Sequence, residues 1–360
     1  MSNSKKVVLV ISTLLLMTGA FFLPKLFIDN DLVENPVDEV MEAAEEEEEM
    51  EDIVEEMRGL AEKPEEESEA VSLWEIRDEV LMDYGSNPMP VFQDEDLLVF
   101  AYESKAKGLV EAPSDKSKFM QTEDGENFVA VDNSDQVYDY RLAPLKLADG
   151  RYRRYVHNEK VGGIESYISD DGLNFEQEEG LRYEIDTGGE RDPAFFGVST
   201  YFLDSEGGVV LLYNATDENG NVLVNRAYAP PETEGMEFEL TDEDILGGTL
   251  EGEGYADPNA VVRENGDVWL VVLHHPVDRP APPLVKRGDI FAYVSRDDGE
   301  SFELEGQIMS YSDFEEFEVW SLNDPKITEF KGQLTVVVAA MVADDSGEKE
   351  FKWILVSSEQ

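Results

Sequence analysis

The stretch Ser169-Asp170-Asp171-Gly172-Leu173-Asn174-Phe175 predicts a tight turn, and its pattern of glycine followed three residues later by phenylalanine occurs three more times, at Gly125, Gly235 and Gly299. In three of the four copies an aspartate precedes the glycine and a serine or threonine lies slightly upstream. Ser and Asp side chains can accept hydrogen bonds from the turn backbone, and glycine supplies a positive φ. The phenylalanine would anchor the outgoing strand. The copies are spaced by 47, 63 and 64 residues, so the chain is an array of supersecondary units.

Short β-rich runs with turns between them begin at residue 84, and five repeats open in a similar way. The openings are Asn87-Pro88, Arg141-Leu142-Ala143-Pro144, Asp192-Pro193, Asp257-Pro258 and Asp324-Pro325. A strongly apolar second strand, expected to be buried on both faces, follows each opening at 97–102, 152–156, 209–213, 268–273 and 334–340. Third and fourth strands flank each Gly-x-x-Phe turn. The sequence therefore predicts an all-β fold, a five-bladed β-propeller with four antiparallel strands in each blade.

One outer strand is missing from this count, because the chain ends just after the third strand of repeat five at 353–357. A propeller hides its sheet edges by closing its ring, so the missing strand should precede the first repeat. Trp74 lies 14 residues before Pro88, close to the 16 residues between Phe128 and Pro144. We therefore predict that a strand around residues 71–77 completes the fifth blade.

The composition limits the function classes. With 360 residues, 41% of them apolar, the chain can bury a large core. Its net charge of −54, about −39 of it beyond residue 69, would repel phosphate backbones, which excludes nucleic acid as a partner. This acidity is typical of a high-salt habitat or of simple solubility. Cysteine is absent, which excludes disulfides and thiolate metal sites, and we expect neither a metal nor a cofactor.

The N-terminal segment has the pattern of a targeting sequence. Lys5 and Lys6 precede an uncharged run at 7–23, as in a signal peptide or an N-terminal membrane anchor with the rest of the chain outside. Residues 1–28 are assigned to this segment and 29–70 to an acidic low-complexity spacer, either helical or solvated. Residues 71–360 then form the propeller domain. We expect a monomeric propeller at the cell surface, anchored in the membrane through the N-terminal helix, or a secreted one.

The order of Asp-Pro, hairpin turn, aliphatic strand and Ser-x-Asp-Gly-x-x-Phe turn resembles five-bladed propellers of the arabinanase, levansucrase and invertase type of glycoside hydrolase. The resemblance covers residues 84–360, and Ser295 to Phe302 also matches the spacing of the sialidase Asp-box. It implies a carbohydrate substrate or ligand. The implied function is an inverting glycoside hydrolase, or else a non-catalytic carbohydrate- or protein-binding propeller at the cell surface. A sialidase is less favoured, because it needs three arginines around the substrate carboxylate.

Residues just before the opening prolines should face one mouth of the central channel. Carboxylates from different blades at such a mouth are what an inverting glycosidase needs. The resemblance implies a base at Asn87, an orienting carboxylate at Asp192 and a general acid at Asp257. Asn87 has no carboxyl group, so Asp324 is the substitute for the base. The predicted catalytic residues are Asp192, Asp257 and Asp324.

Neighbouring side chains are candidates for substrate binding. An arginine beside Asp192 would keep that carboxylate ionised and grip hydroxyl groups, and a tryptophan near Asp324 would stack on a sugar ring. The predicted binding residues are Asn87, Arg141, Glu190, Arg191 and Trp320. The competing structural interpretation is that Asp before Pro only hydrogen-bonds the strand entry. The histidines, His157, His274 and His275, are expected to be structural.

Overall fold

The computed structural model describes residues 74–83, 85–104, 117–131, 144–158, 162–184, 198–216, 221–247, 253–276, 282, 284–314, 318–343 and 349–358. Within these ranges the fold is all-β, and its one helical element is a 3₁₀ turn at Pro231–Thr233. No helix in the described ranges is long and apolar enough to cross a membrane. The N-terminal run, predicted to be a signal peptide or a membrane anchor, and the acidic spacer, predicted to be helical or solvated, lie outside these ranges.

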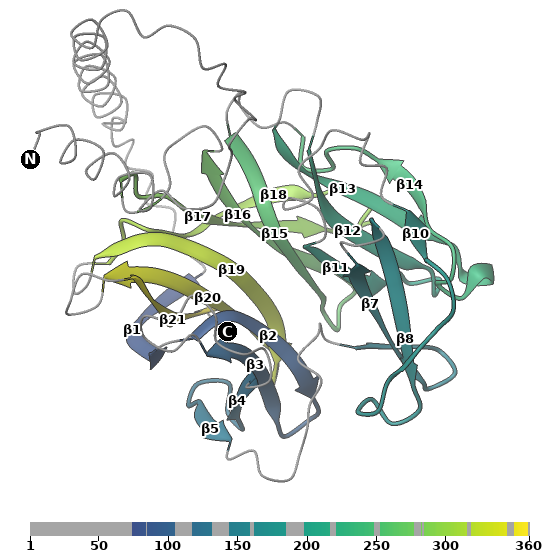
Figure 1. Cartoon of the computed structure of the whole chain (residues 1–360), viewed down its shortest axis with the longest axis horizontal. Coiled ribbons are helices and arrows are strands. Elements are labelled where there is room, and N and C mark those ends of the chain that lie inside the picture. The colour runs from purple at the N-terminus through teal and green to yellow at the C-terminus, as the bar shows by residue number, and fades with distance from the viewer. Residues whose placement is uncertain are drawn as a thin grey trace, which may run out of the picture. The chain divides into compact units, whose positions relative to one another are not determined.

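In the described residues, 21 strands form four hydrogen-bonded sheets (Figure 1). The largest sheet joins two antiparallel groups through one parallel pair, Val222 opposite Gly254, so we describe five groups of antiparallel neighbours. Group 1 is β2 (Gly85–Gln93), β3 (Leu98–Ser104), β4 (Ser117–Thr122) and β5 (Val129–Val131). Group 2 is β6 (Leu145–Lys146), β7 (Tyr152–Asn158) and β8 (Gly163–Ser169), with β9 (Glu176–Gln177) and β10 (Tyr183–Glu184) both paired to β8. Group 3 is β11 (Ser199–Leu203), β12 (Val209–Thr216), β13 (Val222–Ala229) and β14 (Glu239–Asp242). This succession of small antiparallel sheets is propeller-like.

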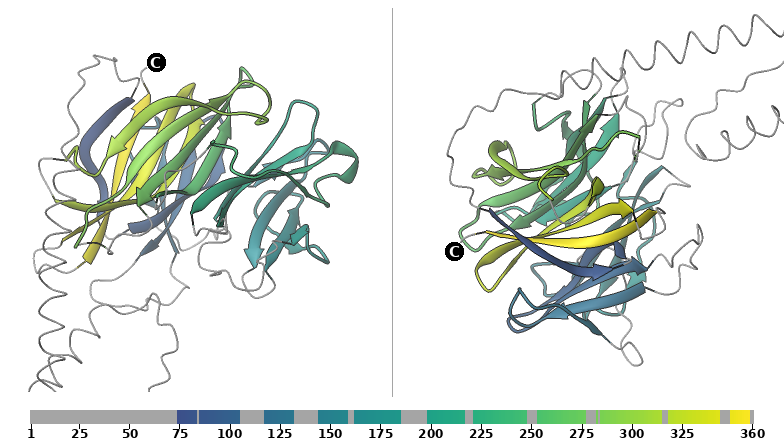
Figure 2. Two further views of the ribbon diagram at one scale, coloured as in Figure 1. Left: turned by 90° about the horizontal axis from the view of Figure 1, so that it is seen from above. Right: turned by 90° about the vertical axis from the view of Figure 1, so that its left-hand side faces the viewer.

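Group 4 is β15 (Glu253–Val262), β16 (Val268–Pro276), β17 (Asp289–Ser295) and β18 (Glu303–Ser310). Group 5 is β19 (Val319–Phe330), β20 (Gln333–Ala343) and β21 (Lys349–Ser358), to which the N-terminal β1 (Trp74–Asp83) is added. β1 pairs antiparallel with β21, from Trp74 opposite Ser358 to Asp83 opposite Lys352. Figure 2 shows this purple strand beside the yellow C-terminal ones. The predicted pairing of an N-terminal strand with the last sheet is confirmed.

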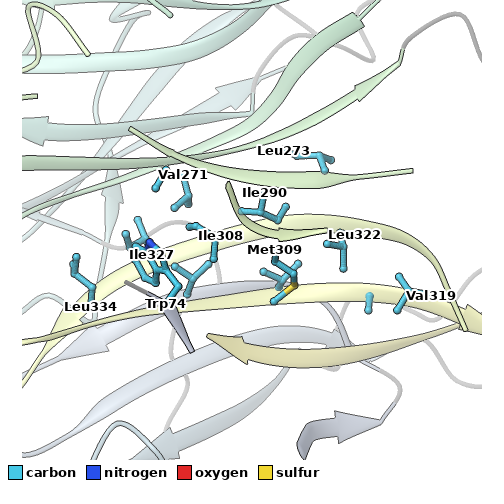
Figure 3. Packing of buried hydrophobic residues seen from close by; sticks show 14 of the residues in the cluster. Trp74, Val271, Leu273, Ile290, Ile308, Met309, Val319, Leu322, Ile327 and Leu334 are labelled. Carbon is cyan, nitrogen blue, oxygen red and sulfur yellow. The ribbon is translucent and has the colours of Figure 1, made fainter. Parts of the chain in front are cut away.

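The second strands of groups 3, 4 and 5 each lie between two neighbouring groups. In β12, Val209 and Leu211 pack with Tyr155 of group 2, whereas Val210 and Leu212 on the other face pack with group 4. β16 alternates in the same way between groups 3 and 5, and β20 packs against group 4 on one face and group 1 on the other. Figure 3 shows the cluster between groups 4 and 5. Because both faces are covered, near-continuous apolar sequence is required there, as predicted.

Three turns have the predicted internal hydrogen bonds. In the second of them, Ser169 Oγ accepts from the N–H of Gly172 (2.9 Å), and Asp171 Oδ1 accepts from the N–H groups of Leu173 (2.9 Å) and Asn174 (2.8 Å). These donors, with Asn174 contributing most, lower the pKa of the Asp171 carboxyl. The turn at Gly125 repeats the pattern, whereas in the turn at Gly299 the accepting aspartate is Asp297 and not the predicted Asp298. All three glycines have φ between 76° and 82°.

Gly299 also closes an interface between groups, which gives a stability prediction. A Cβ on this residue would meet the Phe202 ring of group 3 at 2.6 Å, in addition to the strain of its φ of +80°. Gly332 has the same φ of +80° with nothing within 4 Å. Gly299→Ala should cost about 1–3 kcal/mol more than Gly332→Ala, measured by denaturant unfolding of each variant. Equal losses would show that the turn does not hold the two groups together.

Hydrogen bonds connect the first strands of successive groups. The N–H of Ala260 in β15 donates to Thr200 Oγ1 in β11 (3.0 Å), and the N–H of Ile327 in β19 donates to Asn259 Oδ1 (2.8 Å). Thr328 Oγ1 then donates to Gln93 Oε1 in β2 (2.9 Å). The first strands of groups 3, 4, 5 and 1 therefore lie side by side, and they bring residues far apart in sequence to one place.

Candidate active site

Three of the predicted site positions are structurally equivalent. Asn87, Asp257 and Asp324 each precede a proline and have a left-handed backbone, with φ of 54°, 54° and 51°. Each forms a bulge in the first strand of its group. In group 4, for example, Ala256 pairs with Leu273 and Asn259 with Val271, so Asp257 and Pro258 oppose a single residue. Groups 1 and 5 have the same break in register. A bulge of this kind re-aims a side chain and often lies beside an active site.

The backbone conformation explains the residue types. Asn and Asp are the residues other than glycine that adopt φ above zero most readily, because their short polar side chains can hydrogen-bond locally. A following proline disfavours helical conformations of the residue before it, so the bulge carries some strain. The structural interpretation of Asp before Pro therefore applies to all three positions. Any chemical role must come from what surrounds each side chain.

Asp257 differs from its two equivalents in lining a partly open cavity of about 190 Å³. Residues of groups 3, 4 and 5 form the walls, and Asn87 and Asp324 are not among the described residues that line it. The polar lining consists of Asn214, Asp257, His275, Arg287, Ser321 and Asn323. We call this space the Asp257 cavity. It combines one carboxyl, one imidazole and one guanidinium group with neutral hydrogen-bonding groups.

Burial raises the pKa of the Asp257 carboxyl. Two groups act against burial, the charge of the buried Lys326 on β19 and a hydrogen bond from the backbone N–H of Asp324, but burial is the largest influence. The carboxyl therefore keeps its proton to a higher pH than an exposed aspartate does. A proton held in this way is what a general acid requires.

His275 and Arg287 face Asp257 from β16 and from the segment before β17. Burial lowers the pKa of His275, and the nearby charge of Arg287 lowers it further, so the imidazole is neutral at pH 7. The backbone of Arg287 is joined to β19 at both ends, since its N–H donates to the Trp320 carbonyl (3.1 Å) and its own carbonyl accepts from Leu322 (3.2 Å). These two bonds position the guanidinium beside the cavity.

Gly288 makes this close approach of Arg287 to β19 feasible. A Cβ on Gly288 would meet the backbone nitrogen of Leu322 at 2.9 Å and its carbonyl oxygen at 3.0 Å. Its φ of +106° is also one that residues with side chains rarely adopt. Glycine is therefore required at this position, and the pair Arg287-Gly288 is a local signature of the cavity.

Asn214 holds the backbone of Asp257 in place. It is buried in β12, and its Oδ1 accepts from the N–H of Asp257 (3.0 Å). Its Nδ2 donates to the carbonyl of Tyr255 (2.9 Å). The amide thus supports the left-handed bulge from the neighbouring group. Because Asn214 is buried, it cannot serve as the glycosylation site that the sequence Asn214-Ala215-Thr216 matches.

The remaining predicted site residues have different positions. Arg141, Glu190, Arg191 and Asp192 lie outside the described residues. Trp320 is half-buried at the start of β19 and is not among the described residues that line the Asp257 cavity. Among the residues that the structure describes, no group of three or more His, Cys, Asp or Glu side chains could hold a metal ion.

The predicted opening of repeat three, Asp192-Pro193, lies outside the described residues, and β11 begins after it. β11 pairs with β12 from Ser199 opposite Tyr213 to Leu203 opposite Val209, and the N–H of Asn214 donates to Val198 (3.0 Å). Val198 and Ser199 lie as far before the hairpin between β11 and β12 as Asp257 and Pro258 lie before the hairpin between β15 and β16. They are therefore the equivalent positions in group 3, and β11 has no two-residue bulge. The spacing in the sequence indicates this difference. Pro193 lies 16 residues before β12, the second strand of group 3, whereas Pro258 lies only 10 residues before β16, the second strand of group 4. Asp192 belongs to the segment 185–197, which ends at the cavity-lining Val198.

Sequence reasoning missed His275, Arg287 and Asn214 as residues of the cavity. His275 is expected from the sequence to be structural, but it lines the cavity, whereas its neighbour His274 packs between Tyr255 and Phe291. Arg287-Gly288 offered one detectable signal, an arginine before glycine at the start of a strand in a chain with few basic residues.

No protein-family model matches the chain, and no curated protein matches it. Among solved structures, a GH43_12 retrieved from a capybara gut metagenome is similar with a TM-score of 0.50 and 11% identity, over 80% of this chain and 54% of that one. The catalytic domain of the Coprinopsis cinerea GH62 alpha-L-arabinofuranosidase has a TM-score of 0.49 and 10% identity, over 79% and 96% of the two chains. A thermostable family-43 glycoside hydrolase has a TM-score of 0.47 and 12% identity, over 76% and 89%. The described residues therefore share their propeller-like fold with glycoside hydrolases, as the sequence resemblance indicated.

Proposed function

We propose that the chain is a glycoside hydrolase in which Asp257 is the general acid. The observation that carries this proposal is the Asp257 carboxyl itself, which lines a partly open cavity with polar walls and whose pKa is raised by burial. Glycosidases need one carboxyl group that is protonated at the working pH and a second that is ionised. The propeller-like fold shared with glycoside hydrolases is consistent with this role but does not assign it.

The architecture that we propose is one ring of five blades, with the five strand groups as blades and β1 closing the fifth. Packing of β12, β16 and β20 against the groups on both sides supports the order 2, 3, 4, 5 and 1 around the ring. A larger cavity, of about 520 Å³, supports it as well, because the first strands of all five groups contribute to its walls. In such a ring the Asp257 cavity lies at the end where the first strands begin.

The second carboxylate of the mechanism is proposed to be Asp192, with Asp324 as the alternative. Asp192 belongs to the segment that leads directly into Val198 on the cavity wall. Arg191 and Glu190 are its neighbours, and Arg141 is the fourth polar residue that we assign to this mouth. Asp324 donates its backbone N–H to the Asp257 carboxyl, so we assign it a positioning role if Asp192 proves to be the base.

In the proposed reaction Asp257 transfers its proton to the glycosidic oxygen as the bond between that oxygen and the anomeric carbon breaks. Water attacks the anomeric carbon from the opposite face, and the second carboxylate accepts a proton from this water. The products are a sugar of inverted configuration and a free alcohol. Arg287 is placed to donate hydrogen bonds to sugar hydroxyl groups, and its guanidinium disfavours protonation of the base beside it. Neutral His275 donates its Nδ1–H to the Pro276 carbonyl, so its Nε2 is placed to accept a hydrogen bond from a sugar hydroxyl.

The proposal is tested by a substrate screen. The purified chain is incubated with aryl arabinofuranosides, aryl xylosides, arabinan oligosaccharides and sucrose, and products are followed by NMR from the first minutes. We expect turnover of at least one compound, with the inverted anomer appearing first. Retention of configuration would reject the two-carboxylate water mechanism, and inactivity on every compound would favour the binding-only alternative.

Asn87 favours that alternative, a non-catalytic carbohydrate- or protein-binding propeller. The position that corresponds to the base in the resembled families carries an amide, which cannot accept a proton from water. In that case sugars should bind without turnover, and Trp320→Ala, which removes the half-buried ring at the start of β19, should weaken the binding. Binding without turnover in the parent chain, lost in this variant, would replace the hydrolase proposal.

We also propose that residues 1–28 direct the chain out of the cytoplasm, where a polymeric carbohydrate would be met. The lysines before the uncharged run at 7–23 support this orientation. Expression of the full chain in a bacterial host, followed by protease treatment of intact cells, should degrade the propeller domain. Protection of that domain in intact cells would contradict export.

A further inference from the structure

The larger cavity lies at the opposite end of the first strands, where they turn into the second strands. Its volume is about 520 Å³, and all five groups contribute to it. Representative lining residues are Phe92, Lys146, Thr200, Asn259, Ile327 and Thr328. We call it the hairpin-end cavity. None of the described residues that line it also lines the Asp257 cavity.

We propose that the hairpin-end cavity binds a neutral saccharide, at a site separate from the Asp257 cavity. Asn259 is the first reason, because only 7% of it is exposed and it lines this cavity. Its Oδ1 is occupied by the N–H of Ile327 (2.8 Å), which leaves Nδ2 as the unused end of the amide. Among the described residues this Nδ2 has no hydrogen-bond partner. A donor that faces the cavity can bind an acceptor from water or from a ligand.

Thr200 supplies a second polar group beside it. The residue is 4% exposed, and its Oγ1 accepts from the N–H of Ala260 (3.0 Å). The hydroxyl hydrogen of Thr200 has no acceptor among the described residues, so it can donate to an oxygen in the cavity. Two adjacent first strands thus present unused donors, from an amide and a hydroxyl, to the same space.

The rest of the wall indicates the class of ligand. Apolar surface is provided by Met89, Pro90, Phe92 and Ile327, while the charged groups, Asp94, Glu95, Asp171 and Lys146, are exposed at the rim. A wall that is neutral inside disfavours an ion, and a rim with three acids and one base repels anions. Neutral sugars combine hydroxyl oxygens with apolar C–H faces. The cavity matches that combination, and its volume falls within the range of small-molecule sites.

This proposal stands apart from the hydrolase proposal, because it concerns other residues and requires no chemistry. It is tested in the full-length Asp257→Asn variant, in which turnover cannot consume the probe. Binding of xylobiose, cellobiose, maltose and sucrose is measured by calorimetry and saturation-transfer NMR, with glucuronate as the anionic probe. We expect at least one disaccharide to bind with a Kd of about 1 mM and glucuronate to bind at least about tenfold more weakly.

Asn259→Asp removes the donor but keeps the acceptor for Ile327, so it should weaken disaccharide binding by about tenfold. The control is Asn265→Asp, the same change of charge at the exposed turn of the same hairpin, which should leave the Kd unchanged. If Asn259→Asp fails to fold, Ala260→Leu fills the cavity from a half-buried lining position and should have the same effect. Absence of disaccharide binding up to about 10 mM overturns the proposal. Unchanged affinity in the folded cavity variant, or tighter binding of glucuronate than of any disaccharide, overturns it as well.

Discussion

Asp257→Asn is expected to abolish hydrolysis while raising thermal stability at neutral pH. Loss of a general acid lowers kcat by about 10²–10⁴-fold. The backbone should be undisturbed, because Asn87, an asparagine before a proline in the equivalent bulge of group 1, has the same φ of 54° as Asp257. The variant therefore separates chemistry from folding. kcat is measured on the substrate identified by the screen, and melting by circular dichroism.

The stability gain follows from the raised pKa. Between the unfolded and the folded pKa of Asp257, the native state holds a proton that the unfolded state has released. Native protein then binds more protons, so the free energy of unfolding falls as pH rises through this window. This side chain's contribution is fully present below the unfolded pKa and lost above the folded one. Asparagine has no proton to lose, so the melting advantage of the variant should increase from acid to neutral pH, at about 2–4 °C per kcal/mol.

Asp298→Asn is the matched control. Asp298 also has a left-handed backbone, with φ of 59°, but it lies in a turn and accepts hydrogen bonds from Ser205. Its substitution should leave kcat unchanged and give no increase in melting temperature with pH. Full activity of Asp257→Asn would place the general acid elsewhere, and an unchanged pH dependence of melting would show that Asp257 is not the buried acid described above.

Removal of residues 1–83 should lower the melting temperature by about 10 °C or more, or prevent folding, because it deletes β1. The Trp74 ring packs edge-on against Trp269 at 5.8 Å in the cluster between groups 4 and 5. Loss of a buried tryptophan costs about 3–5 kcal/mol by itself. The truncation also exposes the edge of β21, which is a template for association between chains.

Removal of residues 1–70 is the control for this truncation, since it keeps all of β1 and deletes only sequence before it. This shorter truncation should melt like the parent. Melting is followed by calorimetry, and association by light scattering. If the chain lacking residues 1–83 melts like the one lacking residues 1–70, pairing of β1 with β21 does not stabilise the domain.

Local features of this fold could be predicted from the sequence, because the interactions that form them are short-range. In the turn at Gly172, Ser169 and Asp171 bind backbone N–H groups two or three residues away, so the pattern of residues itself encodes the structure. Burial of β12 and β20 on both faces could also be predicted, because a strand that is covered on both faces requires an unbroken run of apolar residues. Pairing of β1 with β21 was predictable because a propeller must hide its edges.

The candidate site was decided by the tertiary structure. Asp257 was predictable as a strand-opening residue, but Asn87 and Asp324 share its sequence pattern and its backbone, and neither is among the described residues lining the Asp257 cavity. What distinguishes Asp257 is the hydrogen bond from its N–H to Asn214, 43 residues before it, and the cavity that it shares with Arg287 and Asn323, 30 and 66 residues after it. The raised pKa depends on the burial that these elements create together. Composition and spacing along one strand carry no information about which strands of other groups cover it, so only the packing of groups 3, 4 and 5 determines where the proton is held.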